Sequence, residues 1–154
     1  FDLDLVNKQS RENPVFYLQY GHARCASILA RAADTGVAFV GVDKLTDAQL
    51  ARLTMPEEKA ILKKLSQLPD VVANAADRLE PHHVLYFCQE LIGDFHSYYS
   101  KDKSERVISD DVDKTQGRLA LVAALKHTLH SAFGLLGITA PEHMQAPADD
   151  DAII

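Results

Sequence analysis

The sequence predicts an all-α protein built as a helical bundle. Apolar residues recur at spacings of three and four along several long segments, the pattern of helices that bury one face. No run of strands alternates with these segments, as a parallel sheet would require. The 154 residues, of which 47% are hydrophobic, are enough for one domain with a substantial core.

The first long helix is predicted from Asn13, through the string Asn-Pro-Val-Phe-Tyr-Leu-Gln-Tyr-Gly-His-Ala-Arg at 13–24, to about Ala33. Asn13 can cap the first amides, and proline at position 14 suits the first helical turn. A helix places one set of residues on a face that we expect to join the core: Val15, Leu18, Cys25 and Leu29. On another face it places two tyrosine rings, a gap where glycine has no side chain, and a guanidinium: Tyr17, Tyr20, Gly21 and Arg24.

Further helices follow from capping and proline positions. The Thr46 and Gln49 spacing is that of a capping box, and Thr54 with Glu57 repeats it. The second box opens a helix with this expected polar face: Glu57, Glu58, Lys59, Lys63 and Lys64. Pro69 should end or kink that helix, and Pro81 should begin a strongly periodic one that reaches about residue 99.

The last part of the chain is predicted to be a loop, a long helix and a tail. Residues 100–114 mix both charges and favour an exposed loop. A helix from Thr115 or Gln116 should run to a stop at Gly137. Residues 145–154 form an acidic tail, without which the net charge falls from −6 to −3. An acidic domain can still bind unpaired bases by stacking, although we expect it to bind RNA weakly on its own.

Composition also limits the compartment and the chemistry. We expect a cytosolic protein without a membrane span, because no run of about 18 uncharged apolar residues and no secretory leader is present. Cys25 and Cys88 sit in apolar helical patterns and are interpreted as buried thiols. The seven histidines show no pair of Glu-x-x-His motifs, no His-Glu-x-x-His and no Cys-x-x-Cys, so no metal site and no catalytic centre are predicted.

The aromatic and cationic residues leave two interpretations open. Besides Tyr17, Tyr20 and Arg24, later helices carry Tyr98, Tyr99 and Arg118. Tyrosines can line the edge of a bundle core while arginines remain solvated, which requires no function. The same residues can instead form a surface for a ligand.

Several strings resemble the anticodon-binding domain of arginyl-tRNA synthetases, in the same order along the chain. The segment 13–24 is nearly identical in wording to the segment that opens that domain. Later blocks are Leu-Thr-Met-Pro-Glu-Glu-Lys at 53–59, Leu-Pro-Asp-Val-Val at 68–72, Pro-His-His at 81–83, Phe-His-Ser-Tyr-Tyr at 95–99, and Gly-Leu-Leu-Gly-Ile-Thr-Ala-Pro-Glu-His-Met at 134–144. Gly-Arg-Leu-Ala-Leu at 117–121 lies in the block that names the DALR domain, although Asp-Ala-Leu-Arg is not spelled here.

The resemblance implies a helical bundle of the class I synthetase type, with a linker from a catalytic domain at 1–12, the anticodon-binding domain at 13–144 and the tail at 145–154. The family joins arginine to tRNA with ATP, but its HIGH and KMSK motifs are absent. We therefore expect tRNA and a catalytic domain of the same chain as partners, no cofactor in this part, no activity alone and no oligomer.

The resemblance also assigns residues to tasks. It implies that Tyr17, Tyr20 and Met144 bind tRNA, with Tyr99 as a weaker candidate. A second set is assigned to packing or to domain docking: Gln19, His22, Arg24 and Arg118. Two other hypotheses remain, a helical module that docks another protein and the helical domain of a related class I synthetase.

Overall fold

The computed structural model describes residues 10, 12–100 and 107–145. Every regular element in these residues is a helix, which confirms the all-α prediction. The elements in order are α2 (Pro14–Asp34), η1 (Val42–Lys44), α3 (Asp47–Leu50), α4 (Pro56–Leu65), α5 (Leu68–Arg78), α6 (His82–Tyr99) and α7 (Val112–Leu136).

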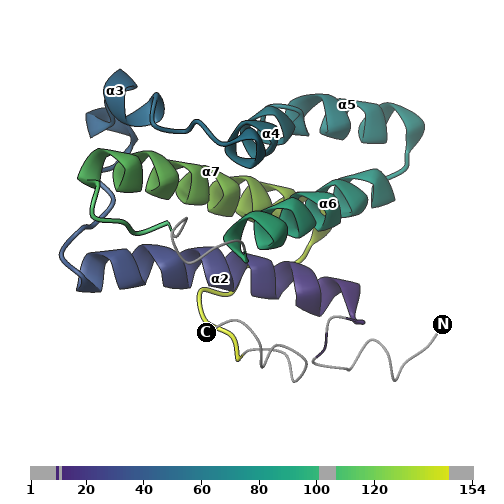
Figure 1. Ribbon diagram of the computed structural model, residues 1–154. Helices are drawn as coiled ribbons and strands as arrows, with labels where there is room; N and C mark the ends of the chain where they lie inside the picture. The colour runs from purple at the N-terminus through teal and green to yellow at the C-terminus, as the bar shows by residue number, and fades with distance from the viewer. Residues whose placement is uncertain (1–9, 11, 101–106, 146–154) are drawn as a thin grey trace.

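The helices form three layers (Figure 1). Helices α6 and α7 make the middle layer, and α2 packs against both of them from one side. The short helices α3, α4 and α5 cover the opposite side, where α5 contacts α6, α3 contacts α7, and α4 contacts both. One face of α2 therefore meets the core, and its remaining faces are available for other contacts.

The start of α2 is as predicted. The Asn13 side chain accepts hydrogen bonds from the amides of Val15 and Phe16, at 3.1 and 3.3 Å. Of the expected core face, Leu18 and Cys25 are fully buried, whereas Val15 is 40% exposed. Val15 lies in the first turn of α2 on its exposed side, so the prediction was wrong for this residue.

Close approach of the helices requires glycine at two positions. A Cβ atom on Gly21 would lie 2.8 Å from Cδ1 of Ile92 on α6, and a Cβ atom on Gly117 would overlap the backbone of Gln49 at the end of α3. Gly21 therefore marks the line along which α2 and α6 meet. The space left by the missing side chain of Gly21 is filled by Ile92 of α6 and is not an open gap.

Two predicted helix starts were wrong. Helix α7 begins at Val112, three residues early, because the Asp111 carboxylate accepts from the Lys114 amide at 3.0 Å and caps it. The loop before it is not fully exposed either, since Val107 is buried. Its residues 101–106 lie outside the described part, as do residues 1–9 and 11 of the predicted linker and residues 146–154 of the predicted tail.

The second error concerns α4. The N-cap there is Met55 and not Thr54, and the Glu58 carboxylate accepts a hydrogen bond from the Met55 amide at 3.0 Å, in place of the predicted pairing of Thr54 with Glu57. Glu58 was expected on the polar face but is fully buried. Its carboxylate turns inward because it serves both the cap and an ion pair with Arg118, described below.

Helix α7 is long and apolar enough, by length and composition alone, to cross a membrane. The core helix of a soluble domain has the same properties. Its inward side is buried against the other helices along most of its length, from Thr115 to Phe133. The packing of α7 in the centre of the bundle accounts for its apolar sequence.

Both cysteines lie in the core as free thiols, as expected from their apolar surroundings. Burial raises the pKa of Cys25 to about 12, and burial likewise raises the pKa of Cys88 to about 12. Neither thiol is therefore ionised near neutral pH.

Candidate nucleic-acid interface

Helices α2 and α6 bring five side chains together, which we call the tyrosine cluster: Tyr17, Tyr20, Arg24, His96 and Tyr99. All five are partly exposed. The spacing of three and four residues places the α2 members on one face, and the contact of α2 with α6 brings His96 and Tyr99 beside them.

The rings of Tyr17 and Tyr20 both pack edge to face against the imidazole of His96. The Tyr17 hydroxyl lies 3.2 Å from Nδ1 of His96, and the two ring centroids are 5.4 Å apart at an interplanar angle of 84°. The Tyr20 ring also meets His96 edge to face, at 6.4 Å. These contacts limit the rotation of both tyrosines, so that their exposed surfaces are presented in a fixed orientation.

Arg24 adds a cation to the same cluster. Its Cζ atom lies 4.8 Å from the centroid of the Tyr99 ring and 6.0 Å from that of Tyr20. A guanidinium at this distance is attracted by the ring, and its planar outer face can stack on a further ring or contact a phosphate. The cluster therefore combines planar apolar surfaces with one positive charge, which suits an unpaired nucleotide.

The segment 139–142 is held by hydrogen bonds beside another face of α2. Gln19 donates from Nε2 to both the carbonyl oxygen and the hydroxyl of Thr139, at 3.1 and 2.7 Å. His22 donates from Nδ1 to the carbonyl oxygen of Pro141 at 2.9 Å. Figure 1 shows this terminal segment crossing α2. The half-buried Met144 follows three residues after Pro141.

A salt bridge extends this attachment to α7, since Nζ of Lys126 lies 2.7 Å from a carboxylate oxygen of Glu142. The hydrogen bond from Lys126 lowers the pKa of Glu142. His22 is completely buried, and burial lowers its pKa although the bond to Pro141 acts in the opposite direction. Its Nε2 atom is buried and has no hydrogen-bond partner among the described residues.

Two further aromatic and cationic residues noted in the sequence, Arg118 and Tyr98, lie in the core and not at this surface. Arg118 is 0% exposed, and its Nε donates to the buried carboxylate of Glu58 at 2.8 Å. The Tyr98 hydroxyl donates to the same carboxylate oxygen at 3.1 Å. We call these three residues the buried polar triad. It joins α4, α6 and α7, so the interpretation of Arg118 as a solvated cation was wrong.

Sequence reasoning missed three groups. His96 belongs to the tyrosine cluster, and its position three residues before Tyr99 on the same helix was the available signal. Glu58 was placed on the wrong face, because nothing in the periodicity marks a carboxylate that pairs with a residue 60 positions away. The third group is a single Glu-x-x-His string at 80–83, which the absence of a pair of such motifs does not exclude as a metal site.

Comparison with known proteins identifies the family of the chain. The model of the DALR anticodon binding domain family matches residues 18–144. An arginine–tRNA ligase of Anaeromyxobacter sp. (strain Fw109-5) is 46% identical over 154 residues, and one of Syntrophotalea carbinolica is 49% identical over 144. The matches cover 98% and 94% of this chain but 25% of each relative, so the chain spans about a quarter of their length.

The solved structures include a Campylobacter jejuni protein described as an arginyl-tRNA synthetase, with a TM-score of 0.72 and 26% identity over 94% of this chain and 29% of that one. The arginyl-tRNA synthetase of Thermus thermophilus has a TM-score of 0.66 and is 29% identical over 83% of this chain and 21% of that one. Family, relatives and fold agree, and the chain belongs to the DALR anticodon-binding domain family.

Proposed function

We propose that this chain, as the anticodon-binding part of an arginine–tRNA ligase, holds unpaired bases of the anticodon loop of tRNA. The observation that supports this most directly is the tyrosine cluster, a fixed set of partly exposed rings with one guanidinium on the face of α2 that the resemblance assigns to tRNA. Stacking on an aromatic ring tolerates any base and needs little net positive charge. It therefore suits a domain whose overall charge is negative.

Residues of the cluster and of the chain end receive different roles in this proposal. Tyr17 and Tyr20 stack on bases. The ring of Tyr99 packs against one face of the Arg24 guanidinium and holds it in place. Gln19 and His22 position the terminal segment, so that Met144 reaches the same loop as a polarizable apolar contact. Arg118 acts only through the stability of the bundle.

We further propose the arrangement of the longer protein. Residues 1–12 lead from the catalytic domain, 13–144 form the anticodon-binding domain and 145–154 form a tail. The whole enzyme then uses ATP to join arginine to its tRNA in the cytoplasm, which agrees with the reduced, buried thiols. This part alone has no catalytic residues and carries no cofactor.

A second surface supports the catalytic domain as a partner. An apolar cavity of about 490 Å³ lies between the segment 39–53 and α7, and its rim includes the exposed side chains of Val42 and Leu50. About three quarters of the length of the relatives lies outside this chain. In a full-length ligase, Leu50→Asp should lower the rate of arginylation and speed proteolytic cleavage between the two domains. Leu135→Asp, at an exposed position outside the cavity, should change neither rate.

The tRNA proposal is tested by titrating this chain with the anticodon stem-loop of an arginine-accepting tRNA at low salt. Tyr17→Ala and Tyr20→Ala should each weaken binding by about 1–3 kcal/mol, the usual contribution of one stacked base. Tyr86→Ala is the matched control, because Tyr86 is 53% exposed on α6 but lies outside the cluster. If the double Tyr17/Tyr20 variant keeps its fold and binds as tightly as the unchanged chain, the proposed surface is wrong.

A further inference from the structure

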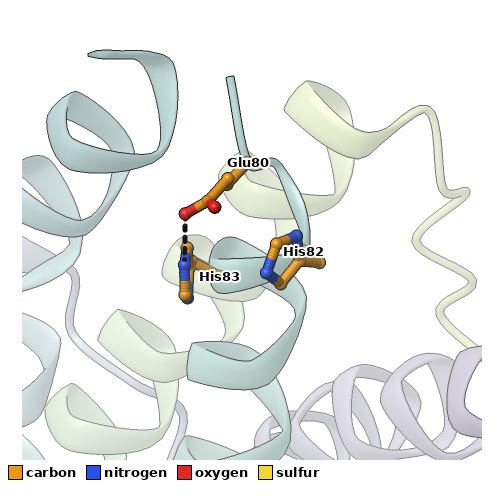
Figure 2. A group of neighbouring side chains, drawn as sticks. All are labelled: Glu80, His82 and His83. Carbon is orange, nitrogen blue, oxygen red and sulfur yellow. Dashed lines mark hydrogen bonds and ion pairs between the residues drawn. The ribbon is translucent and has the colours of Figure 1, made fainter. Parts of the chain in front are cut away.

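The corner between α5 and α6 carries three potential metal ligands: Glu80, His82 and His83 (Figure 2). One ligand atom from each side chain lies within 4.8 Å of the other two. The Glu80 carboxylate is 2.9 Å from Nε2 of His83, and the two imidazole centroids are 4.3 Å apart. No part of the proposed tRNA surface includes these residues.

The backbone of this corner is fixed by hydrogen bonds. Leu79 ends α5 in the left-handed conformation, with φ at 58°, and its amide donates to the carbonyl oxygen of Ala76. The Glu80 amide donates to Ala75 at 2.9 Å, and the His83 amide donates to the Glu80 carbonyl at 3.2 Å. Because the amides of Glu80 and His83 are both bonded, the backbone that carries these two ligands is constrained.

We propose that Glu80, His82 and His83 form a binding site for one divalent transition-metal ion such as Zn²⁺. Two imidazoles and a carboxylate are ligands that Zn²⁺ commonly takes, and bonds of about 2.0–2.1 Å in a tetrahedron place neighbouring ligand atoms about 3.3 Å apart. Because these ligand atoms lie within 4.8 Å of one another, side-chain rotations have to draw them closer when the ion binds. The ion takes the place of the Glu80–His83 hydrogen bond, since the imidazole must offer a lone pair and not a proton.

Exposure sets the character of the site. Both histidines are exposed and Glu80 is half-buried, so water can complete the coordination shell and the ion can exchange freely. The positive end of the α6 dipole opposes a cation at this place, and the Glu80 carboxylate offsets it. Ring contact with Tyr86, 5.5 Å from His82 at 70°, limits the movement of that imidazole.

The test is a calorimetric titration of the 154-residue chain with Zn²⁺ in a non-coordinating buffer. One ion per chain should bind, and the double variant His82→Gln/His83→Gln should bind it at least about tenfold more weakly, since even the loss of an outer-shell partner typically costs 10–100-fold. Glu80→Gln should weaken it as well. His127→Gln/His130→Gln is the matched control, because it removes two histidines three positions apart on α7.

Circular dichroism of each variant checks that the bundle is retained. The proposal is overturned if the unchanged chain shows no saturable binding of Zn²⁺, if the α6 double variant binds as well as the unchanged chain, or if the α7 control removes the binding instead.

Discussion

Tyr98 and Tyr99 are neighbours in the sequence, yet they belong to regions of opposite character. Tyr98 is 2% exposed and donates its hydroxyl to the carboxylate of Glu58 within the buried polar triad. Tyr99 is partly exposed and lies under the guanidinium of Arg24 in the tyrosine cluster. A helix turns by about 100° per residue, which is enough to send one ring into the core and the next to the surface.

The same residue types therefore contribute to folding stability in one region and to surface binding in the other. In the triad, an arginine and a carboxylate that are both 0% exposed have lost their hydration, so each depends on the other for stability. In the cluster, an arginine and a tyrosine remain in contact with water, and their mutual attraction contributes little to folding. We expect substitutions in the triad to unfold the domain and substitutions in the cluster to leave it folded with its binding changed.

The largest effect is expected from Arg118→Met, which leaves the Glu58 carboxylate buried without its cation. Breaking a buried pair from one side costs about 3–5 kcal/mol of unfolding free energy. Urea denaturation followed by circular dichroism measures it. Arg24→Met is the matched control on the surface and should change the unfolding free energy by less than about 1 kcal/mol.

The double variant Glu58→Met/Arg118→Met sharpens this test, because removing both charges removes the unpaired one and should recover part of the loss. Equal destabilisation by Arg118→Met and Arg24→Met would contradict the distinction between the two regions.

A smaller effect is expected from removing single hydroxyl groups from the adjacent tyrosines. Tyr98→Phe deletes a hydrogen bond to a buried carboxylate and should destabilise the domain by about 1.5–3 kcal/mol, the usual range for a bond to a charged group. Tyr99→Phe keeps the ring under Arg24 and should stay within about 0.5 kcal/mol, as surface substitutions usually do. The same urea denaturation compares the two variants, and the reverse order would show that the triad is not the more stabilising region.

The sequence predicted the helices well because their ends are set by local chemistry. Helix starts depend on contacts within one turn of the chain. The three residues predicted to start helices each occupy an N-cap position in the structure: Asn13, Thr46 and Pro81. It failed for Glu58, whose polar character predicted solvent while its partner Arg118 lies on another helix. It also failed for Val112, because the first turn of α7 is exposed and carries no apolar period.

The candidate site divides in the same way. Periodicity placed Tyr17, Tyr20 and Arg24 on one face of a helix, which needs only the local spacing. It could not show that α6 brings His96 and Tyr99 to that face, or that Gln19 and His22 hold the chain end. These contacts join residues 75 to 120 positions apart and depend on tertiary packing. The prediction that this face of α2 binds tRNA came from the family resemblance and not from periodicity.

His22 offers the finest test, since it is buried like Tyr98 but lies on α2 with the cluster. It donates from Nδ1 to Pro141, and its Nε2 atom has no partner among the described residues, so a second proton there would add a charge without hydration. Burial lowers the pKa of His22 below its ordinary value near 6.5, against the bond to Pro141 and the nearby Glu142 carboxylate, while Lys126 and His130 add to the lowering. The unfolded chain therefore binds a proton more readily than the folded one, and stability must fall as pH drops below about 6.5 toward the folded pKa.

The unfolding free energy of the unchanged chain should accordingly decrease from pH 7.5 to pH 5.5, a range that stays above the titration of Glu142. In His22→Gln the decrease should become smaller, because the glutamine amide can still donate to Pro141 but cannot take up a proton. His143→Gln, which removes an exposed histidine from the same segment, is the control for the loss of a histidine. Urea denaturation at the two pH values measures all three chains. If His22→Gln and the unchanged chain lose the same stability between the two pH values, His22 does not couple the attachment of the chain end to pH. The decrease would then come from another of the seven histidines.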